Sequence, residues 1–413
     1  MVKVYTCQNG VRIVYEHIPY VRSISMGVWV GAGSRFEQAE ENGITHFIEH
    51  MLFKGTTTRT ARQIAEEFDR IGGEINAFTS KENTCYYAKV LDHHGQLAMD
   101  ILADMFFNST FQADELEKER QVVLEEILMS EDAPDDDVHE RVNRVMYPND
   151  PLGLPILGTK ERLESFTADT IRNYMAKHYY PKNVVISLVG NVSKELLSHI
   201  EKLFGQFEGS PKAVPQNFTN PNFHSGLYVK EKDIEQSHIA ISYPGVSLKD
   251  TNYYSFVAFN NILGGNMSSR LFQEVREEKG LAYSIFSYQS CYTDVGSITI
   301  YGSTSNQQLP TLQETILQSL ERVKKEGITV RELENAKEQM KGSFVLSQES
   351  STNRMSRNGK NEFVHGYHAT IDEVLERIDK VSMDSLNKLI ENILQAEPAT
   401  AIIGQGINQL VKK

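Results

Sequence analysis

Two histidines and a glutamate lie close together in the run HFIEH at residues 46–50. The run follows Asn42-Gly43, and its apolar residues predict a short buried helix. Positions i and i+4 share a helix face, so His46 and His50 could both bind one tetrahedral zinc ion. Glu49 flanks that face and could take a proton from a zinc-bound water as a general base. The alternative is two histidines on an ordinary amphipathic helix, without a metal.

A second helix, expected over residues 112–131, could supply a third ligand. Glu119 and Glu126 are seven residues apart, which is two helical turns, and therefore share one face. Glu126 could complete a site of two histidines and one glutamate that leaves a fourth position open for water. Glu119 could then hydrogen-bond a ligand or the water from outside. Because glutamate-rich helices are often plain solvent-exposed surfaces, the spacing alone leaves both interpretations open.

The elements that must position these residues occur twice along the chain. A helix that opens at residues 166–169 is followed by a strand at 184–190. A helix that opens at 381–384 is followed by a strand at 400–404, about 215 residues later. The stretch 207–225 is rich in glycine, proline and serine and poor in apolar periodicity, so we interpret it as a linker between two halves.

We therefore predict an α+β fold of two tandem homologous domains, each a mostly antiparallel sheet with helices packed on one face. The first domain, residues 1–206, would carry the zinc site, and the linker would follow at 207–225. When the repeat offset is applied to HFIEH, it leads to residues 261–265, which contain no histidine or carboxylate. The second domain, residues 226–413, is thus predicted to be a metal-free repeat; the family resemblance given below implies that it completes the substrate chamber.

Composition narrows the possible partners. The chain has 413 residues, a formal net charge of −13 and three cysteines far apart in the sequence. Nucleic-acid binding needs a basic footprint and is not expected, and no apolar run reaches the ~18 residues that a membrane helix needs. Scattered reduced thiols and a first segment that resembles a strand, not a secretory signal, favour a cytoplasmic location. The acidic charge favours cationic partners such as basic peptides, or simply keeps the protein in solution.

Over essentially its whole length the chain resembles the pitrilysin family of zinc metallopeptidases, in the branch that contains mitochondrial processing peptidase and its short bacterial relatives. The resemblance rests on HFIEH at 46–50, followed about seventy residues later by ERQVVLEE at 119–126, which is the inverzincin pattern. It implies Glu119 as an auxiliary glutamate and one zinc ion per chain. The ligands that it implies are His46, His50 and Glu126, with Glu126 chosen over Glu125.

The resemblance also implies where a substrate would bind. In the family, the segment that matches Asn76, Ala77, Phe78 and Thr79 is an edge strand that adds the substrate backbone as a further strand. Affinity from main-chain hydrogen bonds would tolerate many substrate sequences. On the sequence alone, these residues form an ordinary sheet strand.

Arg276 and Tyr283 in the second half are spaced by seven residues. They resemble the family's pair that holds the substrate and stabilises the developing oxyanion. The alternative is a solvated helix end and a core tyrosine. Long family members fuse two such units around an enclosed chamber, whereas this chain supplies one unit. We therefore expect a homodimer in which Arg276 and Tyr283 of one subunit complete the zinc site of the other; the alternative is that the pair serves the zinc site of its own subunit.

Together these features predict a zinc-dependent endopeptidase in which Glu49 activates the zinc-bound water. Its substrates would be short or unfolded peptides, with basic or presequence-like peptides as one option, bound as an added edge strand in a closed chamber. One alternative is a non-catalytic structural or binding homologue of the same fold, although such proteins typically lose motif residues. Another is a zinc-dependent hydrolase of a non-peptide amide or ester.

Overall fold

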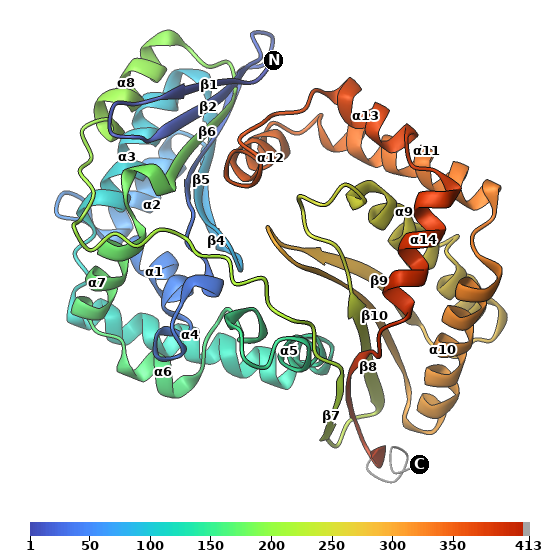
Figure 1. Cartoon of the computed structure of the whole chain (residues 1–413). Helices are drawn as coiled ribbons and strands as arrows, with labels where there is room; N and C mark the ends of the chain where they lie inside the picture. Colours follow the sequence, from blue (N-terminus) through green and yellow to red (C-terminus); the bar gives the residue numbers. More distant parts are fainter. Residues whose placement is uncertain (408–413) are drawn as a thin grey trace. The chain divides into compact units, whose positions relative to one another are not determined.

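The computed structural model describes residues 1–407, which form two compact units (Figure 1). Each unit is assembled from three separate segments of the chain. The first unit consists of Met1–Leu128, Leu154–Asn217 and Leu346–His368. The second unit consists of Met129–Gly153, Phe218–Val345 and the described residues from Ala369 onward. No helix among the described residues is long and apolar enough to cross a membrane.

The first unit is built on a six-stranded sheet with the order β1-β2-β6-β3-β5-β4. Only the β2–β6 pair is parallel among the described strands of this sheet, and the other neighbours are antiparallel. The strands are β1 (Lys3–Thr6), β2 (Arg12–His17), β3 (Ser23–Val30), β4 (Glu74–Thr79), β5 (Thr84–Leu91) and β6 (Val184–Gly190). The helices are α1 (Ile44–Leu52), α2 (Ala61–Arg70), α3 (Gly95–Asn108), most of α4 (Ala113–Asp132), α6 (Lys160–Ser165), α7 (Ala168–His178), α8 (Lys194–Phe204) and α12 (Ser351–Val364).

The second unit repeats this plan with a five-stranded sheet in the order β7-β11-β8-β10-β9. The β7–β11 pair is parallel and the other neighbours in the sheet are antiparallel. The strands are β7 (Gly226–Glu231), β8 (Gln236–Pro244), β9 (Ser284–Cys291), β10 (Gly296–Ser305) and β11 (Ala399–Gly404). The helices are α5 (Pro134–Met146), α9 (Tyr253–Leu263), the π-helix η6 (Phe272–Glu278), α10 (Leu309–Glu326), most of α11 (Val330–Ser347), α13 (Ile371–Asp379) and α14 (Met383–Leu394).

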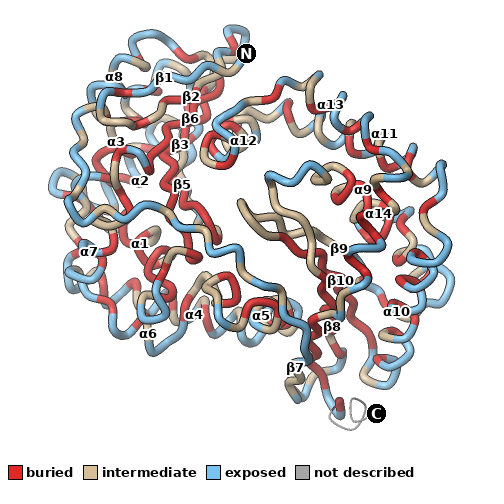
Figure 2. Tube along the Cα trace, in the orientation of Figure 1, coloured by how far each residue is buried: buried red, intermediate tan, exposed pale blue. Residues whose placement is uncertain are grey.

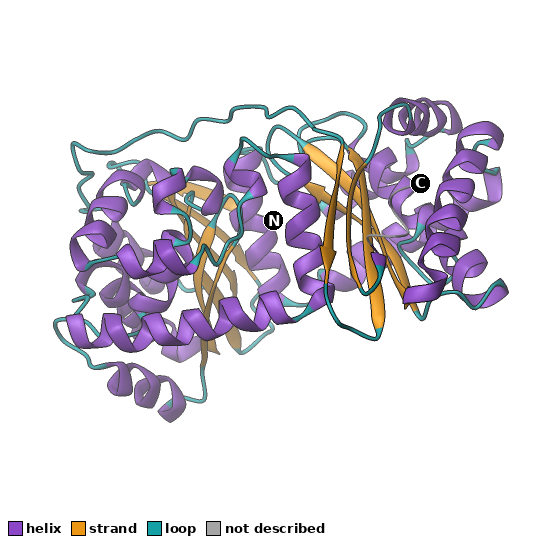
Figure 3. Cartoon of the chain, turned by 90° about the horizontal axis from the view of Figure 1, so that it is seen from below, coloured by secondary structure: helices purple, strands orange, loops and turns teal. Residues whose placement is uncertain are grey.

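The predicted fold class is confirmed, and Figure 3 shows helices flanking the strands of each sheet. The central strands β3 and β6 are buried along almost their whole length, as Figure 2 also shows. Alternate residues of β6, such as Ile186 and Leu188, join the large core that α1, α3 and α8 cover. The residues between them, Val185 and Val189, belong to a smaller cluster on the opposite face. A strand that is apolar on both faces needs cover on both faces.

The helix α12 supplies this second cover in the first unit. It packs against β6 and β3, where the Trp29 indole Nε1 lies 3.4 Å from Met355 Sδ and the Ser187 hydroxyl donates to the Met355 carbonyl at 2.7 Å. The contact is close because Gly359 has no side chain: a Cβ there would lie 2.5 Å from the Trp29 ring. In the second unit, α5 takes the equivalent position with Val138 and Val142 in its apolar cluster.

The predicted domains, 1–206 and 226–413 with a linker at 207–225, are contiguous in sequence. Each unit of the structure instead combines segments from both halves of the chain. Residues 129–153, with α5, belong to the second unit, and residues 346–368, with α12, belong to the first. Each half of the chain thus donates one helix to the unit formed mainly by the other half. The reason is the apolar second face of each sheet, which a helix from the same half does not cover.

The helix α7 packs against α1 and so supports the HFIEH run. Its Tyr174 ring stacks on His178 with ring centroids 4.3 Å apart, and both side chains are buried. Burial lowers the pKa of His178 to about 4. The imidazole is therefore neutral in the folded protein at neutral pH, whereas an exposed histidine takes up a proton near pH 6.5.

This pKa shift predicts an acid sensitivity of the first unit. Because the unfolded chain binds the proton more readily, the contribution of His178 to stability is complete above about pH 6.5 and is lost as the pH falls toward 4. Between pH 7.5 and pH 5 this amounts to about 2 kcal/mol. Urea unfolding followed by the fluorescence of Trp29, the single tryptophan of the chain, measures it in the first unit.

The variant His178→Gln should lose less stability than the wild type over the same pH interval. His93→Gln, at an exposed histidine, is the matched control and should follow the wild type. An equal pH dependence in wild type and His178→Gln would contradict the prediction.

Candidate metal centre

The predicted metal ligands lie together in the first unit. The Nε2 atoms of His46 and His50 lie 3.8 Å and 3.6 Å from the same oxygen of Glu126, Oε2. One ligand atom from each of the three residues falls within 4.8 Å of the others, and residues 1–407 contain no other such group of three or more histidines, cysteines or carboxylates. The sequence placed these groups on two helices seventy residues apart, and the structure brings them to one point.

This donor set fits zinc. With zinc–nitrogen and zinc–oxygen bonds of about 2.0–2.2 Å, the donor atoms of a tetrahedral site are about 3.4 Å apart. The separations of the two histidine Nε2 atoms from Glu126 Oε2 are within a few tenths of an ångström of that value. Two imidazole nitrogens and one carboxylate are also the donors that zinc prefers in sites with an open fourth position.

The helix α1 carries both histidines because its remaining faces are apolar. Phe47, Ile48, Met51 and Leu52 are almost completely buried in the core of the first unit. The two imidazole rings, at i and i+4, have centroids 4.6 Å apart, and both side chains remain partly exposed. Packing therefore fixes the direction in which the two rings point.

The helix α4 orients Glu126 in the same way. Val123 is completely buried in the core and lies on the same face as Glu119 and Glu126, so this face turns toward α1. Glu126 is partly exposed, whereas its neighbour Glu125 is fully on the solvent side. The position in the structure agrees with the choice of Glu126 over Glu125.

Glu119 connects His50 to Lys54. Its Oε1 lies 2.8 Å from Nδ1 of His50, and its Oε2 lies 2.5 Å from the Lys54 ammonium. Because an ionised carboxylate only accepts hydrogen bonds, Nδ1 carries the proton and Nε2 keeps its lone pair for a metal. Burial alone would raise the pKa of Glu119, but the contacts with His50 and Lys54 outweigh it and lower the pKa.

The two histidines differ in their surroundings. Burial, and then the neighbouring His50, lower the pKa of His46 to about 4, which keeps this imidazole neutral. For His50, burial acts in the same direction, but the bond to Glu119 and the charge of Glu126 prevail and raise its pKa. The Nδ1 atom of His46 is buried and has no hydrogen-bond partner among residues 1–407. A side-chain hydrogen bond thus holds Nδ1 of His50, whereas Nδ1 of His46 has none among these residues.

Glu49 lies beside the donor atoms and has its own partner. The Thr79 hydroxyl donates to Glu49 Oε2 at 2.5 Å, which links α1 to the end of β4. Burial raises the pKa of Glu49, and the hydrogen bond from Thr79 opposes the rise. One carboxylate oxygen is therefore held, and the other is available for proton transfer.

The strand β4 lies at the edge of the six-stranded sheet, next to β5. Its side chains alternate between the two faces: Ala77 packs on the core side, and Thr79 reaches Glu49 on that side. Phe78 points to the opposite face, where its ring is 5.5 Å from Trp29 and 6.2 Å from Tyr87. Asn76 accepts a hydrogen bond from the Ala77 amide. The four residues share a backbone edge and do not form one side-chain surface.

Arg276 and Tyr283 belong to the second unit, where they are in contact. The Arg276 guanidinium lies 4.5 Å from the Tyr283 ring centre and 4.8 Å from that of Phe272. Arg276 stands on the π-helix η6, and Tyr283 is 79% exposed, so the phenol is not a core tyrosine. Cation–π stacking holds the two side chains as a pair.

Two contacts of the site have no signal in the sequence: the ion pair of Lys54 with Glu119, and the hydrogen bond from Thr79 to Glu49. Lys54 stands four residues after His50, but its partner Glu119 lies 65 residues further along the chain. No local spacing predicts that ion pair.

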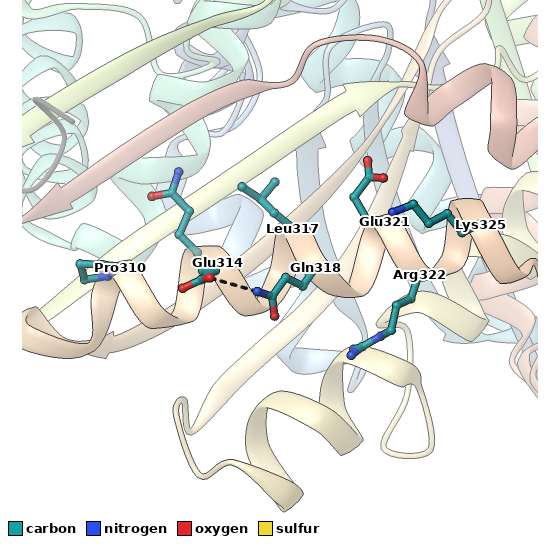
Figure 4. Close-up of a pocket in the computed structure, with 8 residues that line it drawn as sticks. Pro310, Glu314, Leu317, Gln318, Glu321, Arg322 and Lys325 are labelled. Atoms are coloured by element: carbon teal, nitrogen blue, oxygen red, sulfur yellow. Dashed lines mark hydrogen bonds between the residues drawn. The ribbon is translucent and has the colours of Figure 1, made fainter.

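A pocket lies away from these residues. An open pocket of about 750 Å³ runs along α10 in the second unit (Figure 4), where the Gln318 amide donates to Glu314 at 3.0 Å. None of the predicted site residues lines it. Its size alone therefore does not mark it as the functional site.

Two histidine nitrogens and a carboxylate beside a second, partly buried glutamate are the donor chemistry of a zinc hydrolase. Residues 12–160 match the family described as insulinase (peptidase family M16), and residues 165–340 match the family described as the peptidase M16 inactive domain. The chain belongs to peptidase family M16. The resemblance to pitrilysin-family zinc proteases is thereby confirmed.

Relatives agree with this family, and a solved structure shares the fold. The uncharacterized zinc protease YmxG of Bacillus subtilis is 53% identical over 408 residues, which cover 99% of both chains. An uncharacterized zinc protease of Mycobacterium leprae is 38% identical over 97% of this chain and 91% of that protein. The crystal structure of a protease from Helicobacter pylori matches with a TM-score of 0.92 at 24% identity, over 98% of this chain and 99% of that one.

The role of Glu126 is testable by zinc affinity. Glu126→Gln removes one anionic donor, so we expect the zinc dissociation constant to rise by at least about 100-fold, measured by competition with a chelator. Glu125→Gln, one residue earlier on the exposed side of α4, is the matched control and should bind zinc like the wild type. The reverse pattern, with Glu125→Gln impaired and Glu126→Gln normal, would contradict the assignment.

Proposed function

We propose that this protein is a zinc metalloendopeptidase that hydrolyses short or unfolded peptides. The observation that carries the proposal is the convergence of His46, His50 and Glu126 within 4.8 Å, with Glu49 beside them. The names of its relatives, which are called zinc proteases, support the same metal and the same reaction class.

His46, His50 and Glu126 would hold the zinc ion. When bound, zinc supplies Lewis-acid chemistry, because it polarises a carbonyl group and lowers the pKa of water to about 7. Glu119 contributes by fixing the tautomer of His50, and the Lys54 ammonium keeps the Glu119 carboxylate ionised and in place.

Glu49 would act as general base and then as general acid. The Thr79 hydroxyl occupies Oε2, so Oε1 takes the proton from the attacking water. The water oxygen forms a bond to the peptide carbonyl carbon, the carbon–nitrogen bond breaks, and Glu49 passes the proton to the leaving amine nitrogen. The raised pKa of Glu49 brings the carboxyl group closer to the operating pH, which favours both transfers.

The free edge of β4 would bind the substrate as an additional strand. A peptide beside Asn76, Ala77, Phe78 and Thr79 would receive main-chain hydrogen bonds, which place its backbone without demanding one sequence. Because Thr79 at the end of this strand touches Glu49, a peptide along the edge would reach the base.

Arg276 and Tyr283 would hold the substrate and stabilise the developing oxyanion, within a homodimer that encloses a chamber. The support is their stacked arrangement, which presents an exposed phenol and a guanidinium together. The net charge of −13 supports basic peptides as a preferred class of substrate.

The first test is the hydrolysis of a pool of unstructured peptides by the wild type and by Glu49→Gln. We expect Glu49→Gln to lower kcat by about 10²–10⁴-fold, because the amide cannot take the proton, while zinc content stays at the wild-type level. Glu125→Gln serves as the matched glutamate control. Equal activity of wild type and Glu49→Gln would refute the role of Glu49. A wild type that is inactive while loaded with zinc would favour a non-catalytic homologue.

Tyr283→Phe should lower kcat by about 10²-fold with little change in KM if the phenol donates a hydrogen bond only in the transition state. Steady-state kinetics on one peptide from the pool measures the two constants separately. Tyr20→Phe, at a tyrosine of similar exposure, is the control. A rise in KM alone would assign Tyr283 to substrate binding and not to the chemical step.

A further inference from the structure

The first turn of α1 lacks the usual helix cap. Its N-cap residue is Gly43, with a φ of +94° and no side chain to accept a hydrogen bond from the first amides. A larger residue does not fit, because a Cβ at Gly43 would lie 2.7 Å from the Gly158 Cα. The amides of this turn therefore need an acceptor from elsewhere.

Glu37 provides that acceptor from outside the helix. Its side chain is buried, and its Oε2 accepts from the Gly43 amide at 2.8 Å and from the Asn42 side chain at 3.1 Å. Its Oε1 accepts from the Thr45 amide at 2.9 Å. The carboxylate thus bridges the N-cap and the second residue of α1. A negative charge at a helix N-terminus is also favourable toward the helix dipole.

The position of His46 depends on this turn more than the position of His50 does. His46 directly follows Thr45, and its Nδ1 has no hydrogen-bond partner among residues 1–407. His50, one turn later, is oriented by Glu119. The backbone of the first turn therefore sets where the His46 ring lies. With nine residues, α1 is too short to keep that turn formed by helix propensity alone.

A second contact holds the same residue. The Thr45 hydroxyl lies 2.9 Å from the Tyr174 hydroxyl on α7, so Thr45 is fixed at both its amide and its side chain. Asn42 is tied in the same way, because its side chain also donates to the Pro155 carbonyl at 2.9 Å. Glu37 is the group on which the amide contacts of this turn converge.

We propose that Glu37 is a positioning residue for the metal centre, which acts on His46 through the first turn of α1. The inference rests on the zinc site of the proposed function and adds a residue outside the HFIEH run to it. Burial raises the pKa of Glu37 to about 7 against the hydrogen bonds from Thr45, Gly43 and Asn42. Burying a carboxylate costs free energy. The hydrogen bonds that Glu37 accepts from the first turn of α1 explain why a glutamate occupies this buried position.

The test compares zinc affinity with folding stability in Glu37→Gln. The variant keeps the volume of the side chain, but an NH2 group that only donates replaces one of the two carboxylate oxygens. Because the Gly43 and Thr45 amides bond to different oxygens of Glu37, one of them loses its acceptor. We expect its zinc dissociation constant to rise by about 10–100-fold, measured by chelator competition on the full chain. Urea unfolding of the zinc-free protein, followed by Trp29 fluorescence, gives the stability change of the first unit.

Glu362→Gln is the matched control. Glu362 is a buried glutamate of the same unit on α12, bonded to Arg12 and His368 and not to α1. Its replacement should destabilise the first unit while leaving the zinc dissociation constant at the wild-type value. Glu37→Asp keeps the charge on a shorter side chain and should give an intermediate affinity, which also covers the case that Glu37→Gln does not fold.

The outcomes separate the two proposals. If the wild type and Glu37→Gln bind zinc equally tightly, Glu37 is only structural. The inference is then overturned while the proposed function stands. If Glu37→Gln does not fold, the same comparison is made with Glu37→Asp. If Glu362→Gln weakens zinc binding as much as Glu37→Gln does, affinity merely follows stability and the inference is also overturned. If the wild type binds no zinc, the proposed function fails and the inference fails with it.

Discussion

A nine-residue helix must hold two imidazole rings in register with a carboxylate from another helix, and the architecture of the first unit serves that requirement. Such a helix is too short to be stable alone. Its stability comes from Phe47, Ile48, Met51 and Leu52 in the core, from α7 and β4 beside it, and from carboxylates at its two ends. Glu37 is hydrogen-bonded to the Thr45 amide in the first turn, next to His46, and Glu119 is hydrogen-bonded to His50 in the last turn. Each histidine is therefore held at or beside its own position in the helix.

Three glutamates around α1 have the same chemical group and different surroundings. Glu119 faces Lys54 and His50, and these contacts keep it ionised. Among residues 1–407, Glu49 is hydrogen-bonded by the Thr79 hydroxyl and lies near the charges of His50 and Glu126, and burial raises its pKa. Glu37 receives hydrogen bonds from neutral amide donors in a buried place, where the pKa is raised further. The environment thus assigns one carboxylate to orientation, one to proton transfer and one to holding the backbone.

The repeat explains how the sheets are completed. Each half of the chain encodes a sheet with two apolar faces, but its own helices cover mainly one of them. The helices α12 and α5 cover the second faces, each from the opposite half of the chain. Neither half of the sequence therefore contains all the residues of one unit. The small residues Gly27 and Gly359 at the α12 contact belong to this arrangement, since a Cβ at either would collide with the facing side chains.

Local features of the fold and the site follow from the order of the amino acids. Hydrophobic periodicity predicted the helix with HFIEH. The duplicated helix–strand pattern, with strands at 184–190 and 400–404, predicted two α+β halves, because these signals depend on neighbouring residues. The spacing of His46 and His50 fixed their common face, and the spacing of Glu119 and Glu126 fixed theirs.

Tertiary structure alone decided which of these faces meet and what supports them. The pair Lys54–Glu119 joins residues 65 positions apart, and the bond between Thr79 and Glu49 joins a strand to a helix. The helix α5 belongs to the second unit and α12 to the first, each packed on an apolar sheet face. Local sequence patterns do not show which helix covers which face. The role of Glu37 could not be predicted from the sequence either. It depends on the tertiary contact that brings this carboxylate to the Gly43 and Thr45 amides. Contacts between distant segments carry no local signal, since packing in three dimensions selects them.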